Sequence, residues 1–65
     1  MTPGRLWMSL QNDARTMVEA ARRQNVKPSA ADLARRVIAA YESVRGVEQY
    51  ALALEKEIEQ HLNAK

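Results

Sequence analysis

Hydrophobic residues occupy every second position near the start of the chain, in residues 5–10. Leu6, Met8 and Leu10 are separated by Arg5, Trp7 and Ser9. A period of two is the pattern of a β-strand with one buried face. A single strand leaves its backbone N–H and C=O groups unpaired, so a strand here would need a partner strand from a second copy of the chain.

The same segment also fits a helix, and the pattern leaves both structures open. Leu6 and Leu10 are four residues apart, and Ala14, Met17 and Ala21 continue that stripe at helical spacing. A segment this short has too few positions for periodicity alone to separate strand from helix. We expect the strand, with the helix as the alternative.

A helix is predicted over residues 13–24, where apolar residues recur every three or four positions. Asn25 follows its last turn, and Asn tolerates the left-handed backbone that ends many helices. Pro28 disfavours helical geometry at the residue before it. Ser29 and Asp32 then resemble a capping box, which opens a second helix.

The second helix carries a continuous apolar seam with alternating spacings of four and three residues. Its positions are Leu33, Val37, Ala40, Val44, Val47, Ala51, Leu54 and Ile58. Because the spacing keeps its phase past Gly46, we expect one continuous or kinked helix over residues 30–62, with a break at Gly46 as the alternative. The last four seam residues would bind another copy of the chain or a protein partner.

The small size of the chain makes oligomerisation the expected route to a stable core. Chains near 65 residues bury little of their surface, and disulfides, metals or oligomers usually stabilise them. There is no cysteine and one histidine, so neither disulfides nor a histidine-based metal site is expected within one chain. No apolar run suits a membrane helix or a signal peptide. We therefore expect a cytoplasmic protein without cofactor, metal or membrane partner.

Charge divides the chain into a basic front and an acidic back. Residues 1–46 contain eight Lys and Arg against four Asp and Glu, a net charge of +4. Residues 47–65 contain two Lys against four Glu, a net charge of −2. The basic front permits binding to nucleic acid, whereas the acidic back does not favour it.

The order of these elements resembles the ribbon-helix-helix family of DNA-binding proteins over residues 5–44. The similarity rests on the strand candidate at residues 5–10, the turn at residues 25–29, and a second helix with Leu33, Val37 and Tyr41. It implies a mainly α fold, in which the strands of two chains pair antiparallel and lie in the DNA major groove above four intertwined helices. Trp7 departs from the family, which usually places a polar base-reading side chain there, and Asn25 stands where Gly is usual.

The resemblance implies a role for each part of the chain. Residues 1–45 would form the DNA-binding domain, and residues 46–65 a helical extension for oligomerisation or partner binding. The residues that would contact DNA bases are Arg5, Trp7 and Ser9. The residues that would hold a backbone phosphate are Lys27, Ser29 and Ala30, at a helix N-terminus that attracts anions. The residues that would form the core and dimer interface are Leu6, Met8, Leu10, Val18, Leu33, Val37 and Tyr41.

The function implied by this resemblance is that of a sequence-specific, homodimeric DNA-binding regulator, such as a bacterial repressor of the antitoxin or plasmid type. Its partners would be double-stranded DNA and a second copy of the chain. A protein partner would bind the C-terminal helix, through Val47, Ala51, Leu54 and Ile58, or the same residues would join dimers as a coiled coil.

A second class of function fits the same residues, namely a helical protein-interaction or adaptor module. In this all-α alternative, residues 5–24 form one helix packed on the second, and two such hairpins make a homo-oligomeric bundle without specific nucleic-acid binding. An enzyme is not expected, because the sequence has no Gly-rich phosphate loop and no nucleophile beside a base. Glu57 and His61, four residues apart, are expected to be a surface pair and not half of a metal site.

Overall fold

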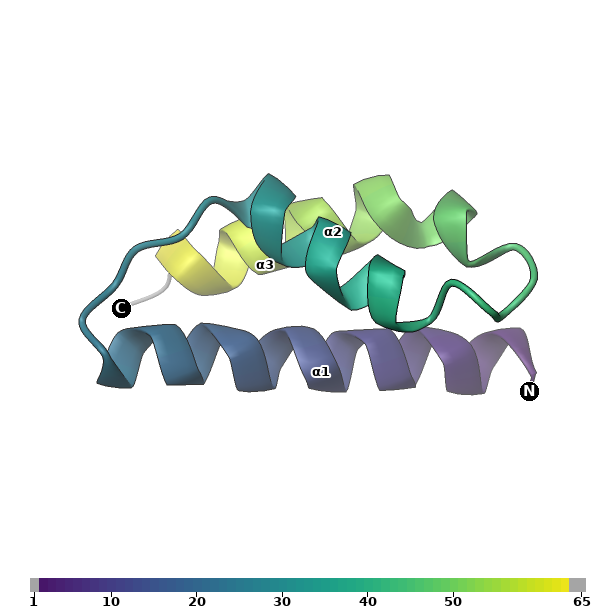
Figure 1. Ribbon diagram of the computed structural model, residues 1–65, viewed down its shortest axis with the longest axis horizontal. Coiled ribbons are helices and arrows are strands. Elements are labelled where there is room, and N and C mark those ends of the chain that lie inside the picture. Colours follow the sequence, from purple (N-terminus) through teal and green to yellow (C-terminus); the bar gives the residue numbers. More distant parts are fainter. Residues whose placement is uncertain (1, 64–65) are drawn as a thin grey trace.

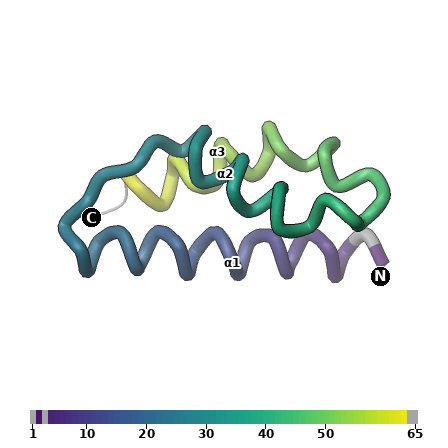
Figure 2. The backbone as a smooth tube through the Cα atoms, viewed as in Figure 1, coloured from purple at the N-terminus to yellow at the C-terminus, as the bar shows by residue number. Residues whose placement is uncertain are grey.

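The computed structural model describes residues 2–63, and its regular structure there is helical. Three α-helices pack side by side: α1 (Pro3–Arg23), α2 (Ala30–Ala40) and α3 (Ala51–Asn63). A short 3₁₀ helix, Val47–Tyr50, immediately precedes α3. Helices α1 and α3 run in the same direction, and α2 runs antiparallel to both (Figure 1, Figure 2). The molecule measures 34 × 18 × 17 Å.

The expected ribbon-helix-helix fold is wrong, because residues 5–10 are helical and residues 2–63 contain no strand. Leu6 and Leu10 satisfy both patterns, since positions four apart share a face in a strand as well as in a helix. Met8 distinguishes the two structures. A strand would bury it beside the two leucines, whereas its side chain is 67% exposed. The structure therefore agrees with the all-α alternative, although with three helices and not a two-helix hairpin.

Local signals at the start of α1 explain why the helix extends over the strand candidate. Thr2 is the N-cap, and its Oγ1 accepts a hydrogen bond from the N–H of Arg5 at 3.4 Å. Pro3 suits the first turn because its φ is already helical. A helix also pairs its own backbone groups, which a lone strand cannot do. One chain by itself therefore favours the helix.

The predicted turn between the first two helices is confirmed. Helix α1 ends at Arg23, and Asn25 has a φ of +60°, in the left-handed region. Ser29 caps α2, because its Oγ accepts a hydrogen bond from the N–H of Asp32 at 3.1 Å. These residues act through local geometry, so the sequence was sufficient to identify them.

The expected continuous second helix is wrong, and the alternative break before the third helix is what the structure shows. Helix α2 ends at Ala40, and Gly46 has a φ of +82°, which glycine adopts without steric strain. A single helix over residues 30–62 would be roughly 50 Å long, longer than the whole molecule. The reversal returns the second half of the apolar seam to the same core as the first half.

The hydrophobic core draws on all three helices. Its members are each at most 5% exposed, and they are Leu6, Leu10, Ala14, Val18, Leu33, Ala34, Val37, Val47, Leu54 and Ile58. Burying one aliphatic side chain of this size contributes about 1.5–3 kcal/mol. Residues on both sides of Gly46 therefore stabilise the same core.

Candidate interaction surface

The residues expected to contact DNA bases do not share one surface. Arg5, Trp7 and Ser9 lie on α1, where successive residues are turned by about 100°, so Trp7 points away from the other two. The ring of Trp7 packs on that of Tyr50, with 5.8 Å between their centroids. Arg5 is exposed and Ser9 is half-buried. No paired strands carry these side chains in the described part of the chain.

The residues expected to hold a phosphate lie at the start of α2, where the sequence placed them. The hydroxyl of Ser29 is already used as the helix cap, as its bond to the Asp32 N–H shows. Asp32 brings a carboxylate into the first turn, and this charge stabilises the helix N-terminus while repelling another anion. Lys27 is exposed, and Ala30 is half-buried.

The residues expected at a dimer interface are mostly in the core of the single chain. Among the core and dimer set, Leu6, Leu10, Val18, Leu33 and Val37 are buried, Tyr41 is half-buried and Met8 is exposed. Among the oligomer and partner set, Val47, Leu54 and Ile58 are fully buried, and Ala51 is half-buried. A surface for another molecule must therefore use other side chains.

Polar contacts join α1 to α3. Gln11 Nε2 donates to Glu57 Oε1 at 2.8 Å. Glu57 Oε2 is buried and accepts no hydrogen bond from the described residues. Arg22 donates from its guanidinium to the carbonyl oxygen of His61. Residues 2–63 hold no group of three acidic, histidine or cysteine side chains placed to bind a metal ion.

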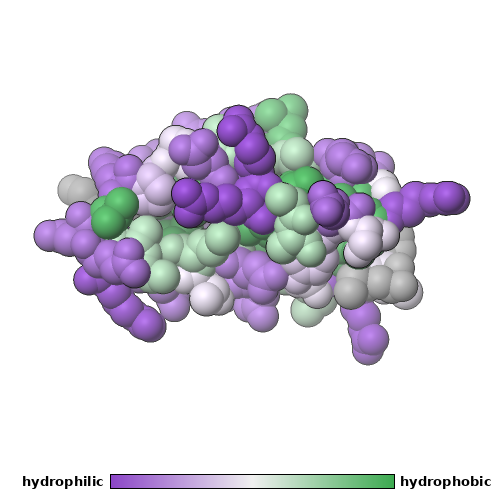
Figure 3. All heavy atoms as spheres, viewed as in Figure 1, coloured by the Kyte–Doolittle hydropathy of each residue, from purple (hydrophilic) through white to green (hydrophobic). Residues whose placement is uncertain are grey.

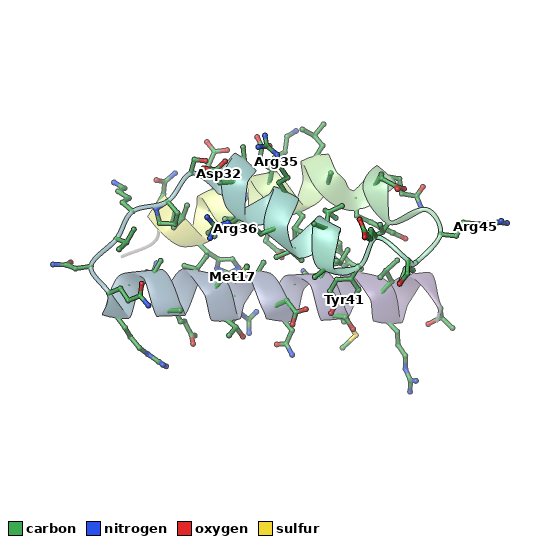
Figure 4. All side chains as sticks on the ribbon, viewed as in Figure 1. Met17, Asp32, Arg35, Arg36, Tyr41 and Arg45 are labelled. Carbon is green, nitrogen blue, oxygen red and sulfur yellow. The ribbon has the colours of Figure 1, made fainter. Side chains whose placement is uncertain are left out.

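Another polar contact joins the end of α2 to α1. The Tyr41 hydroxyl donates to Asp13 Oδ2 at 2.5 Å, and Tyr41 points toward α1 in Figure 4. The pKa of Tyr41 lies above its ordinary value of 10.0, because of the hydrogen bond to Asp13, then desolvation, then the Asp13 charge, while a hydrogen bond with Ser9 lowers it.

A shallow groove runs between α1 and α2. It consists of two hollows of about 290 and 230 Å³ that share Met17 and Arg36 as lining residues. Figure 4 shows both side chains between the two helices. Polar side chains cover much of this face, with small apolar areas among them (Figure 3).

The α2–α3 groove lies on the other side of α2 and has a volume of about 390 Å³. Its apolar lining residues are Ala31, Ala34, Ile38, Ala51 and Leu52. Leu52 is 65% exposed, so it is one of the large apolar side chains left outside the core. Charged residues also line the groove: Arg35 on α2, Glu48 on the 3₁₀ helix Val47–Tyr50, and Glu55 on α3.

Arg35 has an exposed, weakly held position on this groove. Its Nη1 lies 3.9 Å from Asp32 Oδ1, and the two side chains are 80% and 60% exposed. Exposed ion pairs of this kind contribute about 0–1 kcal/mol, so the guanidinium can exchange partners at little cost. Figure 4 shows Arg35 on the side of α2 away from α1, whereas Arg36 lies on the α1 side.

The sequence prediction missed Leu52 and assigned Arg35 no specific role. Leu52 lies two residues before Leu54 and therefore outside the four-three seam. Acidic residues lie four positions before Leu52 and three positions after it. An aliphatic residue that lies off the seam and between acidic residues indicates an exposed apolar side chain on the polar face of a helix.

None of the described helices combines the length and hydropathy needed to cross a membrane.

Comparison with known proteins assigns no family to the chain. No protein-family model matches the sequence, and no curated protein and no solved structure is detectably similar to it.

Proposed function

We propose that the chain is a self-associating helical protein-interaction module, in which a second copy binds at the α2–α3 groove. The observation that carries this proposal is that the exposed Leu52 lines a groove whose other apolar residues are three alanines and Ile38. The expectation of sequence-specific DNA binding depended on paired strands, and the residues concerned are helical. Self-association is the alternative that an all-α fold supports.

The chemistry of the groove favours a helix as its occupant. Alanines on both facing helices leave room for a side chain from another molecule, and helix-in-groove binding uses an aliphatic residue as its anchor. The charged residues of the groove place a second requirement on the bound helix. A helix that lies across Arg35 needs acidic residues beside its aliphatic anchor residue, so that opposite charges meet.

The α3 helix of a second copy, with the 3₁₀ helix that precedes it, meets both requirements. Leu52 on α3 supplies the aliphatic side chain, and Glu48 on the 3₁₀ helix and Glu55 on α3 line the same groove as Leu52. Burying Leu52 contributes about 1.5–3 kcal/mol, and a symmetric dimer makes the contact twice. The proposal therefore needs no partner other than the chain itself.

The test compares two exposed apolar residues in the same chain. Leu52→Gln is expected to weaken self-association at least roughly tenfold in sedimentation equilibrium, because it removes the buried anchor from both halves of the dimer. Met8→Gln is the matched control, since Met8 is 67% exposed on α1 and lies away from the groove. Equal association of the two variants, or a wild-type chain that stays monomeric at all accessible concentrations, would contradict the proposed function.

A further inference from the structure

The two edges of the α2–α3 groove carry opposite charges. The α2 edge has the cation Arg35, and the other edge has the anions Glu48 and Glu55. A face of this kind is complementary to itself after a half-turn, because its basic edge then meets the acidic edge of an identical face.

A two-fold axis that runs along the groove gives this arrangement. Rotation about it would place α2 of each copy over α3 of the other, with each Leu52 against the groove of its partner. Each Arg35 would then face the pair Glu48 and Glu55 of the other copy. The contact would occur twice and use the same patch on both molecules. Neither molecule would then have a free copy of this patch to bind a third chain.

We infer that Arg35, set against Glu48 and Glu55 of a second copy, selects an identical chain as the partner and limits assembly to a closed two-fold dimer. This inference rests on the proposed self-association through the groove. The apolar contact of Leu52 provides attraction to many helices, whereas the charge pattern distinguishes a matching chain from others.

The groups involved are available for this role. The side chain of Arg35 is 80% exposed, and its 3.9 Å pair with Asp32 is weak enough to be replaced. Glu48 is exposed, and Glu55 is half-buried at the margin of the groove. Arg36, the next residue along α2, lies on the other side of that helix and borders the α1–α2 groove (Figure 4).

The test is an exchange of charges between two full-length variants, Arg35→Glu and the double variant Glu48→Arg with Glu55→Arg. Each variant alone places like charges opposite each other in both halves of the dimer, so its self-association is expected to weaken by roughly tenfold or more. Mixed in equal amounts, the two variants place opposite charges together in both halves. The mixture is therefore expected to form a heterodimer with an affinity near that of the wild-type dimer.

The control is Arg36→Glu, which makes the same charge change one residue away and is expected to associate like the wild type. Sedimentation equilibrium measures each association constant, and circular dichroism melting verifies that each variant is folded. If Arg35→Glu associates as well as Arg36→Glu, or if the mixture forms no heterodimer, the inference is wrong while self-association through Leu52 stands. A monomeric wild type would overturn both.

The wild-type chain provides a measurement that does not depend on any variant folding. Salt screens interactions between exposed charges, with a screening length of about 8–10 Å at moderate ionic strength. The association constant of the wild-type dimer is therefore expected to fall as the sodium chloride concentration is raised. A dimer constant unchanged by salt would contradict the role of Arg35, Glu48 and Glu55.

Discussion

At the residue scale, the hydrogen bond between Tyr41 and Asp13 makes a pH-dependent contribution to stability. The pKa of Tyr41 is raised above 10.0 in the folded chain, so this contribution is fully present below pH 10 and is lost as the pH rises through the folded pKa. We predict that Asp13→Ala lowers the stability of the chain by at most about 1 kcal/mol, because the contact is exposed.

The measurement is urea unfolding at a series of pH values, together with ultraviolet absorbance of the ionised tyrosine. The stability difference between wild type and Asp13→Ala is expected to shrink above pH 10, and ionisation of Tyr41 to occur at lower pH in the variant. Glu19→Ala, which removes another exposed carboxylate from α1, serves as the control. A difference that stays constant from neutral to alkaline pH would show that the contact does not depend on the hydroxyl proton.

Single residues also show what could be predicted from the sequence. Asn25 and Ser29 were identified correctly because a left-handed residue and a helix cap depend on their immediate neighbours. Residues 5–10 were assigned to a strand because hydrophobic residues alternate there with Arg5, Trp7 and Ser9, although Leu6 and Leu10 fit both periods. Met8 and Trp7 separate the two structures, because the strand would bury Met8 and expose Trp7, whereas Met8 is exposed and Trp7 packs against the core. The sequence alone does not show whether such a residue is buried or exposed.

At the element scale, the reversal between α2 and α3 depends on the left-handed backbone of Gly46. An added Cβ would meet its nearest neighbour, Gln49 Nε2, at 3.6 Å, which is ordinary contact. The cost of Gly46→Ala therefore comes from the backbone, where a side chain at positive φ costs about 1–2 kcal/mol. We predict that Gly46→Ala lowers the free energy of unfolding by that amount, which urea unfolding measures as a lower midpoint concentration.

Asn25→Gly is the matched variant at the other left-handed position, where φ is +60°. Because Asn and Gly both tolerate this conformation, we expect a change within about 0.5 kcal/mol. Gly46→Ala with wild-type stability would mean that the reversal can form without the left-handed residue.

The path of the chain through its helices could not be predicted from the apolar seam alone. A spacing of four and three residues gives the same positions for one long helix and for two helices that fold back on each other. Val47, Leu54 and Ile58 were predicted to contact another copy of the chain or a protein partner, and the structure places them in the core of the single chain. The choice between outward and inward packing depends on tertiary contacts, as does the exposure of Leu52.

At the scale of the whole molecule, the hydrophobic core contains residues from both the basic part of the chain, residues 1–46, and the acidic part, residues 47–65. A chain truncated after Arg45 would lose Val47, Leu54 and Ile58, which are each fully buried. At about 1.5–3 kcal/mol for each side chain, this loss is comparable to the total stability of a small domain, about 5–15 kcal/mol. We predict that the truncated chain is unfolded, with weak helical circular dichroism and poorly dispersed NMR resonances.

A chain ending at Asn63 keeps every core residue and is expected to melt like the full-length chain, so it controls for the effect of truncation itself. The two truncations separate two organisations of the molecule. If the basic front were a domain with an added acidic extension, the chain ending at Arg45 would unfold cooperatively with dispersed resonances. If all three helices share one core, as the burial of Leu54 and Ile58 against α1 and α2 requires, only the longer chain folds.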